Sequence, residues 1–191
     1  MSNENQEKIS TILEQTEKLD FLIQSLVKLS RMESGIIAVH SEDTTIKQML
    51  ESIQQQFNVK VREKNITLSL CDTDLHVCCD SKWTVEALGN IVDNAIKYTA
   101  CGGNVQIKVE QYSFFVKIDI IDDGIGIEKE EIPKIFGRFY RSLSVADQPG
   151  VGIGLFLARE IIQAQKGYIK VTSKRGKGST FSVFLPIAKK E

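Results

Sequence analysis

A ten-residue stretch, residues 118–127, constrains this chain more than any other part of it. It reads IDIIDDGIGI. Apolar side chains alternate from Val116 to Ile120, which is typical of a strand with one buried face, and the strand ends abruptly at Asp122 and Asp123. The glycines that follow allow backbone to approach a ligand closely beside a fixed carboxylate acceptor. A surface turn uses the same residues, so the stretch alone leaves a ligand site and an Asp-Gly turn equally open.

The length and charge of the chain narrow its class. With 191 residues it can form one ordinary domain and an appendage. Its 24 basic and 25 acidic side chains give a net charge of −1, which offers no basic surface for non-specific nucleic-acid binding. We therefore expect no nucleic-acid partner, and any phosphate chemistry must come from a local cluster.

Cysteine spacing and hydropathy indicate the compartment. Cys71, Cys78, Cys79 and Cys101 form no CxxC pair and few histidines stand near them, so reduced structural thiols are a better interpretation than a zinc site. No apolar run approaches about 18 residues, and the N-terminal letters MSNENQEK lack the core of a signal peptide. The sequence predicts a soluble, cytoplasmic chain.

Residues 9–32 form an amphipathic segment with heptad-like spacing. Its apolar positions are Ile9, Ile12, Leu19, Leu22, Ile23, Leu26 and Leu29, with Thr16 in step. Ser34 and Gly35 end the predicted helix. Such a stripe needs a partner to bury it. Docking onto the chain's own domain is one possibility, but the length of the stripe favours a helix taken from an intermolecular bundle.

The rest of the chain mixes short strands and helices. Thr45 and Gln48 form a capping box for a helix whose apolar side chains are Ile46, Met49, Leu50, Ile53 and Phe57. Asp80 caps a helix over 81–98, a helical turn is expected near 130–135, and Gly167 ends a helix over 152–166. Strands are predicted at 36–40, 66–70, 76–79, 105–109, 115–121, 168–172 and 180–185. Without strict βαβ alternation, these elements indicate an α+β two-layer sandwich of a mixed β-sheet and three main helices, with an N-terminal helix.

The helix over 81–98 has an unusual polar face. Its core stripe is Leu88, Ile91, Val92 and Ala95, and its other face carries Glu86, Asn90, Asn94 and Lys97. Asn in mid-helix costs some tenths of a kcal/mol relative to Ala, so a merely solvated face would be filled by better helix formers. Amide oxygens suit Mg²⁺ that is shared with phosphates, and Lys97 can reach a phosphate as a point charge. We favour this metal–phosphate interpretation over a solvated face.

A glycine-rich run, residues 149–155, leads directly into the next helix and reads PGVGIGL. Exposed N–H groups at a helix N-terminus form an anion site, although the run by itself is a weak signal. Before it stands an aromatic and basic segment that includes Phe136, Arg138, Phe139 and Arg141. We interpret this segment as a mobile cover over a nucleotide, with an ordinary aromatic turn as the alternative.

Together these motifs resemble the catalytic domain of sensor histidine kinases. WTVEALGNIVDNAIKYT resembles the N box, IDDGIGI the first glycine box, PKIFGRFYRS the F box and GVGIGLFLAREII the second glycine box, and GKGSTFSVFLP resembles the closing hairpin. The resemblance runs from about Gly35 to Ile187. It implies a Bergerat-type ATP-binding fold, shared with gyrase, mismatch-repair and chaperone ATPases, and a catalytic domain over 35–191. ATP and Mg²⁺ are the implied cofactors.

The resemblance also assigns roles to single residues. Asp122 would accept a hydrogen bond from the adenine amino group, and Gly124 and Gly126 would let backbone pack against the base. Asn94 would hold Mg²⁺ with help from Asn90. The other implied nucleotide-binding residues are Lys97 at a phosphate, Tyr98 and Thr180 at the adenine pocket, Ile127, Phe136 and Tyr140, and the lid residues Arg138, Arg141, Gly150, Val151, Gly152, Ile153, Gly154 and Leu155. No catalytic residue is implied within this chain.

The N-terminal helix extends the resemblance. LDFLIQSLVKLSRMESG resembles the second helix of the kinase dimerisation and phosphotransfer hairpin, so residues 1–34 are expected to be a remnant of that hairpin. The first helix, with its phosphoacceptor histidine, is absent, and neither His40 nor His76 is followed by an acidic residue. The expected partners are a response regulator, the phosphoacceptor helix of the same kinase and a second copy bound through the N-terminal helix. We expect a kinase domain that binds ATP but cannot phosphorylate itself.

Two other functions stay open. In the related ATPases a glutamate that activates water usually stands at the position of Asn90. Because an amide cannot act as a general base, Asn90 argues for phosphoryl transfer and against an ATP-driven clamp or hydrolase. A nucleotide-binding interaction module without activity is the third possibility, and the full set of pocket residues argues against it.

Overall fold

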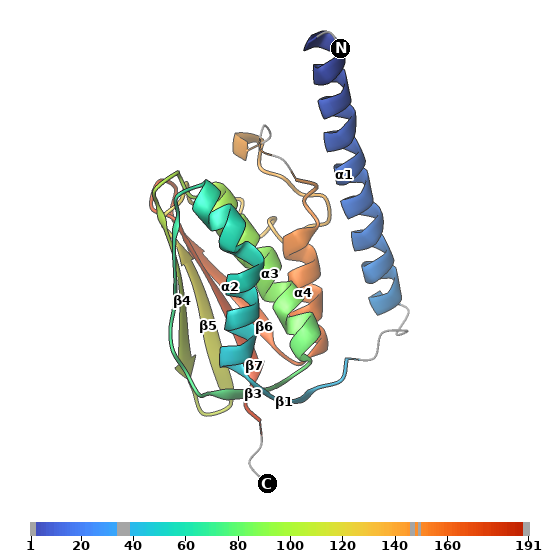
Figure 1. Ribbon diagram of the computed structural model, residues 1–191. Helices are drawn as coiled ribbons and strands as arrows, with labels where there is room; N and C mark the ends of the chain where they lie inside the picture. Colours follow the sequence, from blue (N-terminus) through green and yellow to red (C-terminus); the bar gives the residue numbers. More distant parts are fainter. Residues whose placement is uncertain (1–2, 34–38, 146–147, 149, 189–191) are drawn as a thin grey trace.

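The computed structural model describes residues 3–33, 39–145, 148 and 150–188 (Figure 1). The helices are α1 Asn3–Glu33, α2 Ile46–Glu63, α3 Ser81–Tyr98 and α4 Gly154–Ala164, with a 3₁₀ turn, η1, at Leu143–Val145. The strands are β1 Glu42–Thr45, β2 Thr67–Leu70, β3 His76–Cys79, β4 Asn104–Gln111, β5 Phe115–Asp122, β6 Tyr168–Ser173 and β7 Ser179–Pro186.

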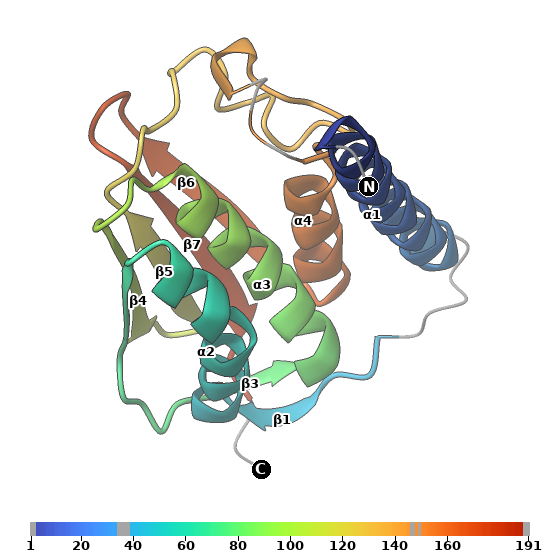
Figure 2. The same ribbon diagram turned by 45° about the horizontal axis from the view of Figure 1, so that its top comes forward.

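The domain has two layers. Five strands form one sheet in the order β2-β4-β5-β7-β6, in which β2 and β4 are parallel and the other pairs antiparallel. Helices α2, α3 and α4 lie together on one face of this sheet (Figures 1 and 2). The predicted α+β sandwich with a mixed sheet and three main helices is therefore confirmed.

The central strands explain how the core leads to a polar end. On β5 and β7 alternate residues are buried beneath the helices, ending in Asp122 on one strand and Ser179 on the other. These two residues face each other in the β5–β7 register. The inward rows of Val116, Ile118 and Ile120, and of Phe181, Val183 and Leu185, are at most 5% exposed. Two polar residues thus end an otherwise apolar row at one edge of the core.

The first predicted strand is misplaced. Residues 39 and 40 are not in a strand, and residues 36–38 lie outside the described part of the chain. The strand instead is β1, which pairs antiparallel with β3. β1 is polar, and only Thr44 is buried in it, so the apolar pattern could not indicate it.

Of the two helix N-caps predicted from the sequence, the one on α3 forms and the one on α2 does not. Asp80 caps α3, accepting a hydrogen bond from Trp83 N at 3.1 Å as predicted. The predicted capping box of α2 does not form, because Thr45 makes no side-chain cap bond and its buried hydroxyl has no partner among the described residues. Thr45 is also the last residue of β1, and its pairing with His76 in β3 directs its side chain.

The end of α4 differs in detail from the prediction. The helix ends at Ala164, and the left-handed residue after it is Lys166, with φ 61°. Gly167 donates its N–H to Ile162 O at 2.9 Å, which completes the helix end. Its lack of a side chain serves packing, since a Cβ there would lie 2.3 Å from Phe184 O. Nearby, the buried Gln165 joins α4 to α3 by accepting from Asp80 N at 2.6 Å.

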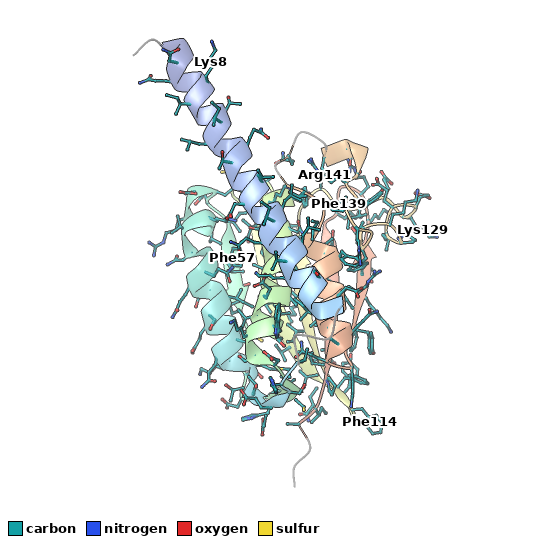
Figure 3. The ribbon with its side chains drawn as sticks, turned by 90° about the vertical axis from the view of Figure 1, so that its right-hand side faces the viewer. Lys8, Phe57, Phe114, Lys129, Phe139 and Arg141 are labelled. Carbon is teal, nitrogen blue, oxygen red and sulfur yellow. The ribbon has the colours of Figure 1, made fainter. Side chains whose placement is uncertain are left out.

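Helix α1 lies beside α4 (Figures 2 and 3). Leu22 packs against the domain core, and Lys28 forms a 2.7 Å ion pair with Glu86 of α3. Much of the apolar stripe remains exposed, namely Ile9, Ile12, Leu19, Ile23 and Leu26, while the side chain of Leu29 lies outside the described residues. Among the described residues, no helix is both long and apolar enough to cross a membrane. All four cysteines are free thiols.

Candidate functional site

The end of β5 separates two adjacent carboxylates by environment. Asp122 is 7% exposed, and its Oδ1 accepts from Gly124 N at 2.9 Å and from Ser179 N at 3.2 Å. Burial raises the pKa of Asp122, and these two hydrogen bonds only partly offset that effect. Within the described part of the chain no group donates to its second oxygen, Oδ2. One oxygen of Asp122 is thus fixed by backbone and the other is available to a ligand.

Asp123 has a structural task instead. Its two oxygens accept hydrogen bonds from Asn104 N and Asn104 Nδ2, both at 2.9 Å. These bonds lower the pKa of Asp123, in the opposite direction to that of Asp122. Asp123 therefore holds the start of β4, and both of its oxygens are engaged there.

The glycines that follow pack against protein backbone. A Cβ on Gly124 would lie 2.5 Å from Tyr98 O, and a Cβ on Gly126, whose φ is 66°, would lie 2.1 Å from Lys174 O. These contacts are with protein backbone, and the expected packing of the two glycines against a base stays a prediction. The absence of side chains at Gly124 and Gly126 is required by α3 and by the β6–β7 turn, although Gly126 does border the cavity described below.

Helix α3 presents its polar face to the same place. Asn90 Nδ2 donates to Glu86 O at 3.0 Å, which leaves the amide oxygen directed at the start of α4, 3.0 Å from where a Cβ on Gly154 would stand. Two turns further along α3, Lys97 Nζ lies 4.8 Å from the centre of the Tyr98 ring. Lys97 Nζ is also 2.8 Å from the position of a Cβ on Gly150.

The glycine-rich run fits between α3 and the segment before it. Gly150 borders Lys97, Gly154 borders Asn90, and a Cβ on Gly152, whose φ is 79°, would lie 2.6 Å from Tyr140 O. No side chain of the described residues caps the start of α4. Three close approaches and an uncapped helix N-terminus together leave backbone N–H groups beside the amides of α3.

We call the described residues 136–145, 148 and 150 the lid. Its first part is anchored on α4, because the Arg159 guanidinium lies 5.6 Å from the Phe136 ring centre and that of Arg138 lies 4.7 Å from the Phe156 ring centre. Tyr140 donates its hydroxyl to Glu131 at 3.1 Å, and burial raises the pKa of Tyr140. Figure 3 shows Phe139 and Arg141 at the end of the domain opposite Phe114.

Arg141 links two parts of the lid by hydrogen bonds to backbone carbonyls. Its Nη2 donates to Val145 O at 3.0 Å and also to Gln148 O. These contacts shape the 3₁₀ turn η1, whose Ser144 and Val145 border the cavity. The segment predicted to be a cover contributes Tyr140, Arg141, Ser142, Ser144 and Val145 to the cavity wall. Its mobility and its role over a nucleotide stay predictions.

One cavity of about 190 Å³ brings most of these groups together. The predicted site residues that line it are Asn90, Asn94, Lys97, Tyr98, Asp122, Gly126, Ile127, Tyr140, Arg141, Gly150, Val151, Gly152, Gly154 and Leu155. Those that do not line it are Gly124, Phe136, Arg138, Ile153 and Thr180. Ile153 is 2% exposed within the core, and Phe136 packs against that core.

Thr180, predicted to lie at the adenine pocket, does not face the cavity, whereas its two neighbours in β7 do. In β7 the residues that face the helices are Ser179 and Phe181, and both line the cavity, whereas Thr180 points to the other face of the sheet. Thr180 was assigned to the adenine pocket by the resemblance alone, without a strand register to test it. The pairing of Ser179 with Asp122 could have indicated the correct residue only once the strand order was known.

Sequence reasoning missed other lining residues. They are Asp93, Ala95, Ile125, Glu131, Ile135, Ser142, Ser144, Val145, Ser179 and Phe181. Most come from the lid and the loop before it, where no periodic pattern marks which side chains face inward. Ala95 was predicted, but only as a core residue of α3.

Comparison with known proteins gives a family match over the part of the chain that lines the cavity. The family of histidine kinase-, DNA gyrase B- and HSP90-like ATPases matches residues 79–189, which include α3, the end of β5, the lid and α4. The chain belongs to this family. Its ATPase domain thus carries the expected fold, and the resemblance to the catalytic domain of sensor histidine kinases is confirmed.

Similar proteins are sensor kinases. Sensor histidine kinase WalK of Bacillus subtilis is 34% identical over 90% of this chain and 29% of its own length. The structure of Acinetobacter baumannii histidine kinase AdeS is 25% identical, covers 95% of this chain and 84% of that one, and has a TM-score of 0.73. Histidine kinase ThkA in complex with response regulator protein TrrA has the same fold, with 22% identity, 98% and 53% coverage and a TM-score of 0.80. This ATPase domain and its helix span about a third of the length of the curated relatives they match.

Proposed function

We propose that this chain is the ATP-binding catalytic part of a sensor histidine kinase, which transfers the γ-phosphoryl group of ATP to a histidine outside this chain. One observation carries the proposal: the buried carboxylate of Asp122, the amides of α3 and the uncapped start of α4 line a single cavity. The family match supports ATP as the ligand.

Asp122 is the proposed reader of the base. Its Oδ1 is held by two backbone N–H groups, so the carboxylate cannot turn away, and its Oδ2 can accept a hydrogen bond from the adenine amino group. Guanine has a carbonyl oxygen at that position, and two acceptors facing each other in a buried site repel. This geometry supports a preference for ATP over GTP.

The amides of α3 are the proposed magnesium site. The Nδ2 of Asn90 is held by Glu86 O, so its oxygen is the atom left for a ligand, and Asn94 stands one turn further along the cavity wall. Amide oxygens are ligands that Mg²⁺ accepts when phosphates and waters complete its shell. When bound there, Mg²⁺ would neutralise charge on the phosphates. Lys97 and the N–H groups at the start of α4 would bind phosphate oxygens.

The other carboxylates in the cavity wall support transfer over hydrolysis. Asp93 forms a 2.6 Å ion pair with Lys60, and Glu131 accepts a hydrogen bond from the Tyr140 hydroxyl. Both are engaged with protein partners, and the amide of Asn90 cannot take a proton from water. The arrangement therefore favours a kinase over the alternative of an ATP-driven hydrolase or clamp.

Partners and domain division are part of the proposal. We propose that residues 1–34 are the second helix of a dimerisation hairpin, that residues 35–191 are the catalytic domain, and that both lie in the cytoplasm. The AdeS match extends over 95% of this chain and so includes much of α1. The complex of ThkA with response regulator TrrA supports a response regulator as partner. The phosphoacceptor helix of the same kinase would supply the histidine.

Calorimetric titration with a non-hydrolysable ATP analogue, with and without Mg²⁺, tests the proposal. We expect saturable binding that Mg²⁺ strengthens and that Asp122→Ala abolishes. Asp123→Ala is the matched control: it removes the neighbouring carboxylate, which contacts Asn104, and should leave binding intact. Nucleotide at a hundredfold its dissociation constant should stabilise the fold by about 2.7 kcal/mol.

Two outcomes would contradict the proposal. Absence of binding at millimolar nucleotide would indicate an interaction module with a vestigial site. Steady ATP hydrolysis by this chain alone would instead support the alternative of an ATP-driven hydrolase or clamp. If binding is found, transfer of phosphate in trans to a separate histidine-bearing helix pair is the decisive activity assay.

A further inference from the structure

The β6–β7 turn, residues 174–178, contacts both the backbone of Asp122 and the lid. We call it the hairpin tip. It is basic, with Lys174, Arg175 and Lys177, and it lies at the same end of the sheet as the lid (Figure 2). Nothing in the proposed nucleotide site uses its charged side chains, so their role needs a separate explanation.

Backbone contacts fix the hairpin tip to the end of β5. Gly176 N donates to Ile125 O at 2.7 Å, and the Ser173 hydroxyl accepts from Ile127 N at 2.8 Å. A Cβ on Gly178 would lie 1.9 Å from Asp122 O, so the two backbones are in direct contact. The hairpin tip cannot shift without moving the loop that holds Asp122.

One side chain extends from this fixed base to the lid. Arg175 Nη1 donates to Ser144 Oγ at 3.1 Å, and its Nε lies 3.9 Å from the Glu128 carboxylate. Ser144 belongs to η1 and borders the cavity, and its N–H and hydroxyl also bond to the Ser142 hydroxyl. The lid turn is therefore linked to the sheet through Arg175.

We infer that Arg175 is a positioning residue that holds the lid closed over the bound nucleotide by its hydrogen bond to Ser144. The inference rests on the proposed function, because it assigns the cavity to a nucleotide. Arg175 acts through Ser144 and does not touch the ligand. Arg175 stands on the hairpin tip, which is fixed to the loop of Asp122. The lid, which would cover the nucleotide, and Asp122, which would bind the adenine, therefore move as one unit.

The kinetics of nucleotide release test this role. In stopped-flow experiments with a fluorescent ATP analogue, Arg175→Ala should raise the dissociation rate about three- to tenfold, the effect of one partly exposed charged hydrogen bond, with little change in the association rate. Lys177→Ala removes the same charge from the same tip without a lid contact and should leave the dissociation rate unchanged. Equal effects of the two substitutions would mean long-range attraction of phosphate, and the inference would be wrong.

A double-mutant cycle identifies the partner. If Arg175 acts through Ser144, then Ser144→Ala should raise the dissociation rate, and the double variant should release nucleotide no faster than Arg175→Ala alone. Additive effects would show that Arg175 contacts the ligand or another group. Arg175→Lys keeps the charge, but its donor group is shorter and differently shaped. Its nucleotide dissociation rate should therefore lie closer to that of Arg175→Ala than to that of the unmodified protein.

Hydrogen exchange of the nucleotide-free protein provides a readout that does not depend on ATP. Arg175→Ala and Ser144→Ala should speed the exchange of lid amides in residues 141–145, while Lys177→Ala should not. Unchanged exchange in Arg175→Ala would overturn the lid contact even if nucleotide binds. Failure of the unmodified protein to bind nucleotide, with faster lid exchange in Arg175→Ala, would instead overturn the proposed function and keep the lid contact.

Discussion

At the scale of single residues, Asp122 shows a conflict between stability and ligand recognition. Its burial raises its pKa, so the folded protein binds a proton more strongly at Asp122 than the unfolded chain does. Stability therefore falls as pH rises from about 4 through the raised pKa, and the ionised form is a net cost to folding above it. Among the described residues no donor occupies Oδ2, so this oxygen remains available to a ligand donor.

Asp122→Asn should separate these two effects. The amide oxygen can keep the hydrogen bonds from Gly124 N and Ser179 N, while the amino group replaces the free acceptor. We expect a higher melting temperature without nucleotide at pH 7, by about 2–4 °C for each kcal/mol gained in the free energy of unfolding. The ATP affinity should fall by about ten- to a hundredfold. Thermal melts between pH 3 and 7 and calorimetric titrations measure both.

The pH series provides the control for this prediction. The stability difference between Asp122→Asn and the unmodified protein should narrow below about pH 4, where the carboxyl is protonated in both folded and unfolded chains. A difference that stays constant across the pH range would show that the ionisation of Asp122 does not destabilise the fold.

At the scale of elements, the β6–β7 hairpin depends on two glycines for different reasons. Gly176 and Gly178 both have positive φ, 74° and 83°. A Cβ on Gly176 would meet nothing within 4 Å, whereas one on Gly178 would lie 1.9 Å from Asp122 O. The first position needs only a left-handed backbone, and the second also needs empty space.

Substitution of each glycine by alanine tests that difference. Gly176→Ala should cost about 1–2 kcal/mol of unfolding free energy from backbone strain alone. Gly178→Ala should cost at least about 2 kcal/mol more, because the hairpin must move away from β5, and it should weaken ATP binding through the loop of Asp122. Chemical denaturation with nucleotide titration checks both; similar losses for the two variants would contradict the packing argument.

At the scale of the whole molecule, the apolar stripe of α1 is the main surface without a partner in the described chain. Ile12 is 64% exposed, Leu19 56% and Leu26 43%, although Leu22 and Lys28 on the same helix contact the domain. Exposure of leucine and isoleucine at heptad spacing is unfavourable in water, which supports the proposed dimer through this helix.

Leu19→Glu should disrupt that dimer. Analytical ultracentrifugation and solution scattering should show a dimer for the unmodified chain and a dimer dissociation constant at least about tenfold higher for Leu19→Glu, since one leucine from each copy leaves the interface. Gln24→Glu introduces the same charge on the opposite side of α1 and should remain dimeric. A monomeric unmodified chain with the stripe in solvent would overturn the proposed dimer.

Much of the fold follows from local patterns in the sequence. The core faces of α2 and α3, the Asp80 cap and the β6–β7 hairpin were predictable because the period of apolar residues and the chemistry of a cap act within a few residues. The polar strand β1 was not predictable, because its pairing with β3, more than thirty residues away, and not its composition makes it a strand.

The site divides in the same way. The sequence by itself indicated that a carboxylate, two helical amides and a glycine-rich helix start belong to one site, because each motif is chemically unusual where it stands, and these groups do line one cavity. Only the tertiary structure decided that Asp122 and not Asp123 is buried, that Ser179 and not Thr180 faces the cavity, and that Arg175 contacts the lid. These outcomes depend on strand register and on packing between distant segments, and a one-residue change of register reverses which side chains face inward.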